Sequence, residues 1–470
     1  MTPFSGWALR SNPFRVPWVF TILLVGFVFC YTVGPRVPEL VVVAECLGVA
    51  MAVCVVIRWI KTGIQIPLEI GILFLFVVWA VGAGGLLATD WALYAEGVER
   101  MVEILLLAGC VAAMAAKCRT PAIGLLAITG LALILAAYSL MTGDFGRAEE
   151  FTREGDRIIG YRASSLAYNP NTLGVSSVWG LAGLAWLWQK AKRVWQRALL
   201  IGAGLLLVAG AVYSGSLKAV VLVPLFLLAW VWFCYRQLLV RRVAVFLSVG
   251  AVAAAIIVGA SFVLRDTYAG ARLQAVVAAD ITDPSTQLRL SMIQEGLQMI
   301  REHPLTGVGL YQFAALSSHQ TYAHNDYVEV AATTGLVGLA IYCSLFAVIA
   351  WRLIRIRRGC RSSEAHYAAG LSLAVLVTCV VAGFARVTCY DIEFWCFISG
   401  VMGFASIARR SAGKRLVWPS QNCGIRQTRG AVRGSPSGAR SMPSARGPAM
   451  VRRARFRGLH GLSVTRANTR

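Results

Sequence analysis

Ionisable and amide side chains gather in one stretch of this otherwise apolar sequence. His324 and Asn325 stand side by side, Tyr322 precedes them, and Arg289 lies upstream. Histidine takes up or releases a proton near neutral pH, because its unperturbed pKa is about 6.5, and it often serves as a general base. The guanidinium of arginine is a rigid fork of donors that suits phosphate oxygens. The pattern therefore predicts proton transfer at His324 near an anion held by Arg289.

Two further cations stand in segments between apolar stretches. Lys218 ends the sequence Tyr213-Ser-Gly-Ser-Leu-Lys, and Arg162 lies in the sequence YRASSLAYNPN. Lys218 either reaches up to lipid headgroups or points into the site, and Arg162 is either a loop charge or a substrate contact. The predicted catalytic residues are His324 and Arg289, and the predicted substrate-binding residues are Lys218, Arg162, Asn325 and Tyr322.

Purely structural interpretations compete with these roles. His324 would then cap a helix or bond a loop carbonyl, and Arg289 would pair with Glu295 or Asp283 at a solvated surface. The segment around them is predicted as an amphipathic helix over 287–302, which Pro304 ends. Its apolar face consists of Leu290, Ile293, Leu297 and Ile300.

The rest of the chain is dominated by apolar segments. Of its 470 residues, 57% are hydrophobic and 14% are charged, whereas soluble proteins carry roughly 25% charged residues. A membrane-spanning helix needs about 20 mostly apolar residues. Twelve segments meet this need, at 17–34, 39–57, 67–88, 97–116, 121–141, 171–189, 198–215, 218–235, 243–264, 330–351, 367–386 and 392–408. We predict an all-α polytopic integral membrane protein with about 12 transmembrane helices, the sixth beginning at Asn169-Pro170-Asn171 with Asn171 as its cap.

The charged residues between these spans predict how the spans are oriented in the membrane. Basic clusters follow the even-numbered spans and acidic residues follow the odd-numbered ones, so the positive-inside rule places both termini in the cytoplasm. A large extracytoplasmic loop, about 265–330, then joins helices 9 and 10. This topology explains the net charge of +23 without a nucleic-acid partner. Residues 1–410 form the membrane domain, and 411–470, rich in Arg, Gly, Ser and Pro, form a disordered cytoplasmic tail.

Neither a metal nor another cofactor is expected. The outward loops contain no cluster of His, Cys and carboxylate side chains with metal-ligand spacing. The sequence also lacks a P-loop and a GxSxG nucleophile motif. Most of the twelve cysteines fall in apolar stretches, where they act as small buried side chains.

In its motifs the sequence resembles the O-antigen ligase and O-antigen polymerase (Wzy-type) superfamily, closest to O-antigen ligase. His324-Asn325 is followed after nine residues by Gly335 and Gly338, and RLSMIQEGLQMIREHPLTGVGLYQF lies upstream, at 289–313. Glycines here let the following helix pack closely against a neighbour. His324 matches the family's motif histidine and Arg289 its loop arginine. Where the family has Ser-Arg, this chain reads Ser216-Leu217-Lys218.

The resemblance implies a metal-independent glycosyltransferase on the periplasmic face of the bacterial inner membrane. The donor would be an undecaprenyl-diphosphate-linked glycan, and the acceptor hydroxyl would belong to lipid A–core oligosaccharide. Membrane lipids are the other expected partners. Alternatives within the superfamily are a polymerase that extends another glycan chain and a protein O-oligosaccharyltransferase.

A different class of function is transport of a lipid-linked sugar. Glu99 and Glu103, one helical turn apart, fit either a core ion pair or a proton-coupled transporter. Internal repeats and matching broken spans would favour transport, and the sequence shows neither. A third hypothesis, an inactive scaffold, rests on the altered Ser-Arg feature.

Overall fold

The computed structural model describes residues 17–63, 66–142, 148–153, 156–161, 163, 165–167, 169–241, 284–359 and 362–407. All of them belong to the first of two compact units, residues 1–420. The predicted ninth span at 243–264, the first part of the large loop, Arg162 and the tail from 411 onward lie outside the described residues.

Helices account for almost all of the described chain. In chain order they are α1 (Trp18–Val33), α2 (Glu39–Thr62), α3 (Leu68–Leu87), α4 (Trp91–Cys118), α5 (Ala122–Thr142), the 3₁₀ turn η1 (Ser165–Ala167), α6 (Pro170–Lys190), α7 (Val194–Tyr213), α8 (Leu217–Arg241), α11 (Pro284–Glu302), α12 (Gln312–Leu316), α13 (Asp326–Gly359), α14 (Ser363–Gly383) and α15 (Ile392–Ala405). One antiparallel hairpin, β1 (Ala148–Arg153) with β2 (Asp156–Tyr161), departs from the predicted all-α class.

The predicted spans coincide with helices wherever the structure describes them, as α1–α8 and α13–α15. Among the described residues, eight helices are long and apolar enough to cross a membrane: α2, α3, α4, α5, α7, α8, α13 and α14. Two further apolar helices, α1 and α15, are shorter. A multi-pass membrane protein is therefore confirmed, whereas the number twelve stays a prediction.

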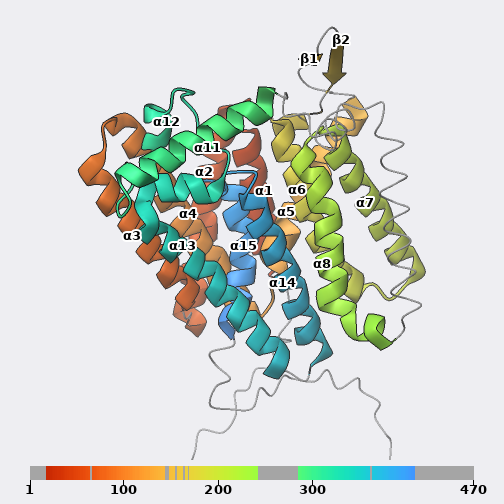
Figure 1. Ribbon diagram of the computed structural model, residues 1–470. Helices are drawn as coiled ribbons and strands as arrows, with labels where there is room; N and C mark the ends of the chain where they lie inside the picture. Colours follow the sequence, from red (N-terminus) through yellow and green to blue (C-terminus); the bar gives the residue numbers. More distant parts are fainter. Residues whose placement is uncertain are drawn as a thin grey trace, which may run out of the picture. The chain divides into compact units, whose positions relative to one another are not determined.

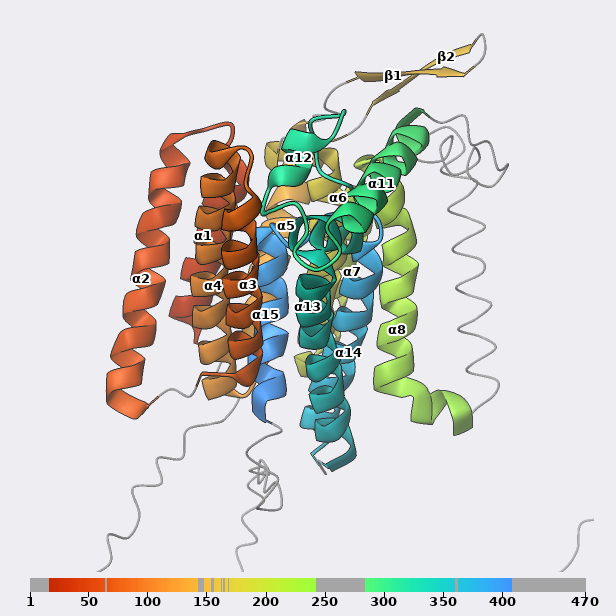
Figure 2. The same ribbon diagram turned by 60° about the vertical axis from the view of Figure 1, so that its left-hand side comes forward.

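Helix α15 is the centre of the bundle (Figures 1 and 2). Every residue from Ile392 to Ala405 is buried. Small residues allow this packing: a Cβ atom on Gly124 of α5 would lie 2.4 Å from the carbonyl oxygen of Cys396. On another side of α15, a Cβ atom on Gly403 would lie 2.1 Å from the carbonyl oxygen of Ala112 in α4. Close backbone approach through small residues is how helices associate in membranes.

The amphipathic helix is present as α11, but its buried face differs from the prediction. Met292, Gly296 and Met299 are buried, whereas Leu290 and Leu297 are 47% and 44% exposed. The reason is Gly296, at which a Cβ atom would lie 2.4 Å from Val328. Because α11 approaches α13 along its glycine, the methionines beside that glycine face inward. Figures 1 and 2 show α11 lying across the end of the bundle where α13 begins.

The cap of α6 is a second correction. Asn169, not Asn171, is the N-cap, and its side-chain oxygen accepts a hydrogen bond from the backbone N–H of Asn171 at 2.9 Å. Pro170 is then the first helical residue, a position that suits proline because no N–H partner is needed there. Asn171 faces α8 instead, since its Oδ1 accepts a hydrogen bond from Ser216 at 3.1 Å.

Candidate functional site

A kink in α13 explains the first glycine of the motif. Gly335 has a φ of 71°, and a Cβ atom there would lie 2.1 Å from the carbonyl oxygen of Leu305. The segment after α11 runs along this kink: Val308 N–H donates to Ala332 O at 2.8 Å, and Leu336 N–H donates to Pro304 O at 2.8 Å. The turn that follows Pro304 is therefore hydrogen-bonded along the kink at Gly335, and the two features depend on each other.

The second motif glycine brings α13 against α3. A Cβ atom on Gly338 would lie 3.2 Å from the Trp79 ring. The indole N–H of Trp79 donates to the carbonyl oxygen of Thr334 at 2.8 Å, just before the kink. Close packing by Gly335 and Gly338, predicted from the sequence, is confirmed.

Asn325 is the cap of α13. Its Oδ1 accepts hydrogen bonds from the backbone N–H groups of Tyr327 at 3.0 Å and Val328 at 3.1 Å. Its Nδ2 donates to the carbonyl oxygen of Phe384 at 3.3 Å. These contacts hold His324 immediately before the helix, in a left-handed conformation with a φ of 53°. The predicted contact of Asn325 with substrate stays a prediction beside this structural role.

Asp326 organises a neighbouring loop. Its fully buried carboxylate accepts hydrogen bonds from the backbone N–H groups of Thr388 and Cys389, each at 2.8 Å. The hydroxyls of Thr388 and Tyr342 donate to its other oxygen. The start of α13 thereby fixes residues 384–391, which connect α14 to α15.

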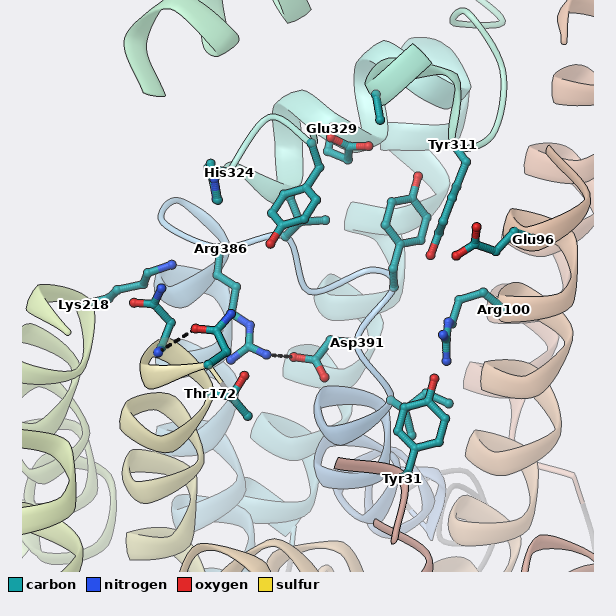
Figure 3. A pocket seen from close by; sticks show the side chains of 17 residues that line it. Tyr31, Glu96, Arg100, Thr172, Lys218, Tyr311, His324, Glu329, Arg386 and Asp391 are labelled. Carbon is teal, nitrogen blue, oxygen red and sulfur yellow. Dashed lines mark hydrogen bonds and ion pairs between the residues drawn. The ribbon is translucent and has the colours of Figure 1, made fainter. Parts of the chain in front are cut away.

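A polar pocket of about 460 Å³ opens at this end of the bundle. It is lined by residues from the end of α1, from the starts of α4, α6, α8, α13 and α15, and from the segments before α13 and α15. Figure 3 shows two groups of side chains in it. The basic end contains Lys218, His324 and Arg386, and the tyrosine end contains Tyr31, Glu96, Arg100 and Tyr311.

His324 lies beside two of the predicted cations. Its pKa is lowered to about 4, chiefly by burial and in addition by the positive charges of Lys218 and Arg289. The imidazole is therefore uncharged at neutral pH, with one N–H donor and one acceptor nitrogen. The ring of Tyr322 meets it edge-on, with centroids 4.8 Å apart. Of the six residues predicted to form the site, Lys218, Arg289 and Tyr322 therefore act on or contact His324, and Asn325 follows it in the chain.

These cations reach the pocket from separate elements. Lys218 is the second residue of α8, after the turn 214–216 in which Gly215 has a φ of 61°. It lines the pocket beside His324. Arg289 comes from α11 and does not line the pocket itself, although it is near enough to act on His324. Arg162 lies outside the described residues, so its predicted role is untested.

Sequence patterns did not single out Arg386. It comes from the loop that Asp326 fixes, pairs with Asp391 at 2.6 Å and lies over the ring of Trp179 at 5.7 Å. Its Nη1 is buried and has no hydrogen-bond partner among the described residues. A guanidinium that is positioned but not fully paired in a pocket wall is suited to bind an anion.

The tyrosine end has a different chemistry. The guanidinium of Arg100 lies 5.1 Å from the centre of the Tyr31 ring and 3.0 Å from the carboxylate of Glu103. This ion pair is formed within α4 and is partly exposed, so it is not the core ion pair expected for this region. Tyr311 packs edge-on against Tyr390, and burial raises the pKa of Tyr311 to about 12, so that its phenol keeps its proton.

Metal-binding clusters are not found in the part of the chain that the structure describes. No group of three or more His, Cys, Asp or Glu side chains there is arranged to hold a metal ion. The expectation of metal-independent chemistry stays a prediction.

Comparison with known proteins agrees with the motif. Residues 202–343, which include Lys218, Arg289 and His324, match the family model Wzy_C, described as O-antigen ligase. A search of the curated proteins gives no match. Among solved structures, one similar chain comes from a peptidoglycan synthase complex described for its coordination of polymerization and crosslinking. That chain is 17% identical with a TM-score of 0.41, and the alignment covers 73% of this chain and 97% of that one.

Proposed function

We propose that this protein, which carries an O-antigen ligase match over residues 202–343, transfers a glycan from undecaprenyl diphosphate to a hydroxyl of lipid A–core oligosaccharide. The reaction would take place on the periplasmic face of the bacterial inner membrane. The position of His324 supports this proposal most. It lines a polar pocket at one end of the bundle, close enough to Lys218 and Arg289 for both cations to lower its pKa.

The leaving group explains the cations. When the bond between the anomeric carbon and the phosphate oxygen breaks, both electrons remain on the diphosphate. Preorganised cations stabilise such developing charge, and the removal of one donor from a comparable site costs about 10²–10³ in rate. We assign this role to Lys218 and Arg289, with the Nη1 group of Arg386 as a further donor at the same end.

The uncharged imidazole of His324 complements these cations. Its N–H can donate a hydrogen bond to a phosphate oxygen. A bound diphosphate would also offset the charges of Lys218 and Arg289, so the His324 pKa would rise again toward its ordinary value. The pKa of His324 would thereby depend on whether the donor is bound. Tyr322, at the edge of the imidazole, would contact the first sugar.

A host without its own ligase, supplied with one lipid-linked glycan, tests the proposal. Wild type, Arg289→Gln, Lys218→Gln and His324→Ala are expressed at matched membrane levels, and surface lipopolysaccharide is resolved by size. Lys192→Gln is the matched control, because Lys192 is exposed after α6, at the far end of that helix from the pocket. We expect ladders from wild type and the control, and losses of about a hundredfold in the three site variants.

Other outcomes would redirect or overturn the proposal. Equal ladders in all five proteins would exclude the site assigned here. Longer lipid-linked chains that never reach lipid A–core would identify a polymerase, and glycosylated protein would identify a protein O-oligosaccharyltransferase. Redistribution of the lipid-linked glycan across the membrane, with no new glycosidic bond, would identify a transporter.

A further inference from the structure

One buried carboxylate faces the polar pocket and has no part in holding the diphosphate. Glu329 lies in the first turns of α13 and is 2% exposed. The backbone N–H of Ala323 donates a hydrogen bond to its Oε2 at 2.8 Å. No hydrogen bond or ion pair to Oε1 is found within the described residues, although the side chain lines the pocket. One oxygen therefore fixes the group and the other is available to a ligand.

We infer that Glu329 is the general base that accepts the proton of the acceptor hydroxyl. This inference rests on the proposed glycan transfer and identifies a catalytic residue for it. The other candidate proton acceptor is His324, and the surroundings of the two side chains decide between them.

The surroundings of His324 oppose protonation. In the free protein the positive charges of Lys218 and Arg289 act against protonation of its imidazole, and in the donor complex the imidazole is assigned to the diphosphate. Its position at the basic end suits contact with the leaving diphosphate. A carboxylate becomes neutral when it takes up a proton, so the charges of Lys218 and Arg289 do not oppose that step.

The place of Glu329 in the pocket suits a single displacement. Lys218 and His324 stand at one end, and Glu329 lies between His324 and Tyr311, toward the tyrosine end (Figure 3). In a single displacement the nucleophile attacks the face of the anomeric carbon opposite the leaving group, so the base and the diphosphate belong on different sides of the sugar. Tyr311 and Tyr390 would then flank the acceptor, whose sugar rings have apolar faces that pack on aromatic rings.

The step balances without a further reactant. The acceptor O–H gives its proton to Oε1 of Glu329, and the oxygen forms a bond to the anomeric carbon. The bond from that carbon to the phosphate oxygen breaks, and its electron pair leaves with undecaprenyl diphosphate beside Lys218 and Arg289. Glu329 later returns the proton to water. The anomeric configuration is inverted.

Purified full-length protein in detergent, with the lipid-linked donor and lipid A–core acceptor, provides the test. Glu329→Gln keeps an oxygen for the Ala323 N–H but cannot take up the proton. General-base catalysis typically contributes 10²–10⁴-fold, so we expect kcat to fall at least a hundredfold while the Kd of the donor stays within threefold. Glu99→Gln, which changes an exposed carboxylate of α4 outside the pocket, should leave both unchanged.

Azide supplies a readout that a structural role would not give. It attacks without losing a proton, so Glu329→Ala with azide should form a glycosyl azide of inverted configuration, at a rate at least tenfold above that without azide. The azide nitrogen bonds to the anomeric carbon as undecaprenyl diphosphate departs. His324→Ala should not be rescued, because its defect lies with the leaving group.

The contrary outcomes separate this inference from the function on which it rests. Active wild type with Glu329→Gln within threefold of its kcat overturns the role of Glu329 alone. Rescue by azide of His324→Ala, but not of Glu329→Ala, assigns the base to His324. Wild type that binds donor but transfers no glycan overturns the proposed function, and the role of Glu329 with it.

Discussion

The Oδ1 atom of Asp326 lies 2.8 Å from the backbone nitrogen of Thr388. This contact joins the residue after the His-Asn pair to a loop that follows 62 residues later in the chain. Arg386 and Asp391 are carried by that loop. The motif therefore positions His324 and also holds the loop that carries Arg386 and Asp391 in the pocket.

Asp326→Ala should lower both stability and activity. It leaves the buried N–H groups of Thr388 and Cys389 without an acceptor, and an unsatisfied buried group costs about 1–3 kcal/mol. Thermal unfolding in detergent measures the loss of stability. The glycan-transfer assay measures the loss of activity that we expect when Arg386 is displaced. Asp326→Asn keeps an oxygen for the two N–H groups and should lose less. Equal unfolding temperatures for the alanine variant and wild type would show that the loop is held by other contacts.

Gly335→Ala should be the more damaging of two glycine substitutions. Alanine at a φ of 71° is strained, and its Cβ would lie 2.1 Å from Leu305 O. We expect a loss of several kcal/mol, because backbone strain in this region costs about 1–3 kcal/mol before the clash is added. Gly82→Ala is the control, since a Cβ atom on Gly82 in α3 would have no neighbouring atom within 4 Å. Comparable yields and unfolding temperatures for both variants would show that the packing of α13 against the preceding turn does not require glycine at position 335.

Hydropathy and charge predicted the helices well because each span is a local pattern. The motif likewise located His324 and Arg289, whereas Lys218 was predicted from its place between two apolar stretches; both cations act on His324 in the structure. What the sequence could not supply was the set of partners for each side chain. The apolar face of α11 was misassigned because periodicity counts Leu290 and Leu297 as core residues, whereas the approach at Gly296 decides the buried face.

Arg386 and Glu329 were missed for a related reason. Each looks ordinary in the sequence: one follows an apolar span and the other stands in the first turns of a span. The position of Arg386 depends on a contact across the fold, from Asp326 to Thr388. The role of Glu329 depends on the pocket that distant elements form around it, while Ala323, six residues earlier, holds one of its oxygens. Glu329 offered one local signal, a carboxylate at the start of an apolar helix. Ionisable residues inside membrane segments are rare and usually functional.

Lys218→Met should raise the pKa of His324. Burial and the charges of Lys218 and Arg289 together lower that pKa to about 4. Removing one cation should move it toward 6.5, and adding pyrophosphate to wild type should do the same. NMR titration of ¹⁵N-labelled histidine gives the value, with His324→Gln to assign the signal. Arg301→Gln, at an exposed position on α11, is the matched control. An unchanged titration midpoint in Lys218→Met would show that the charge of Lys218 does not affect the pKa of His324.

The same histidine makes stability depend on pH. Its folded-state pKa of about 4 lies below the value of about 6.5 expected for the unfolded chain. Between these values the unfolded chain binds more protons, so stability rises with pH across that window. The contribution is fully present above pH 6.5 and is lost as pH falls toward 4. The unfolding temperature of wild type should therefore fall relative to that of His324→Gln as the pH drops from about 6.5 toward 4; parallel curves would contradict this.

A buried ion pair far from the pocket tests how the bundle itself is held. Arg352 of α13 contacts both carboxylate oxygens of Glu69 in α3 at 2.8 Å, and the side chains are 5% and 0% exposed. The sequence places Arg352 in a cytoplasmic basic cluster, but this contact makes it part of the α3–α13 interface. Removing one partner leaves an uncompensated buried charge, which costs about 3–5 kcal/mol, whereas apolar replacement of both is often neutral. Glu69→Leu alone should thus unfold at a lower temperature than the double variant Glu69→Leu/Arg352→Met. If the double variant proved the less stable, the pair would contribute net stability, and its attraction would exceed the cost of burying both charges.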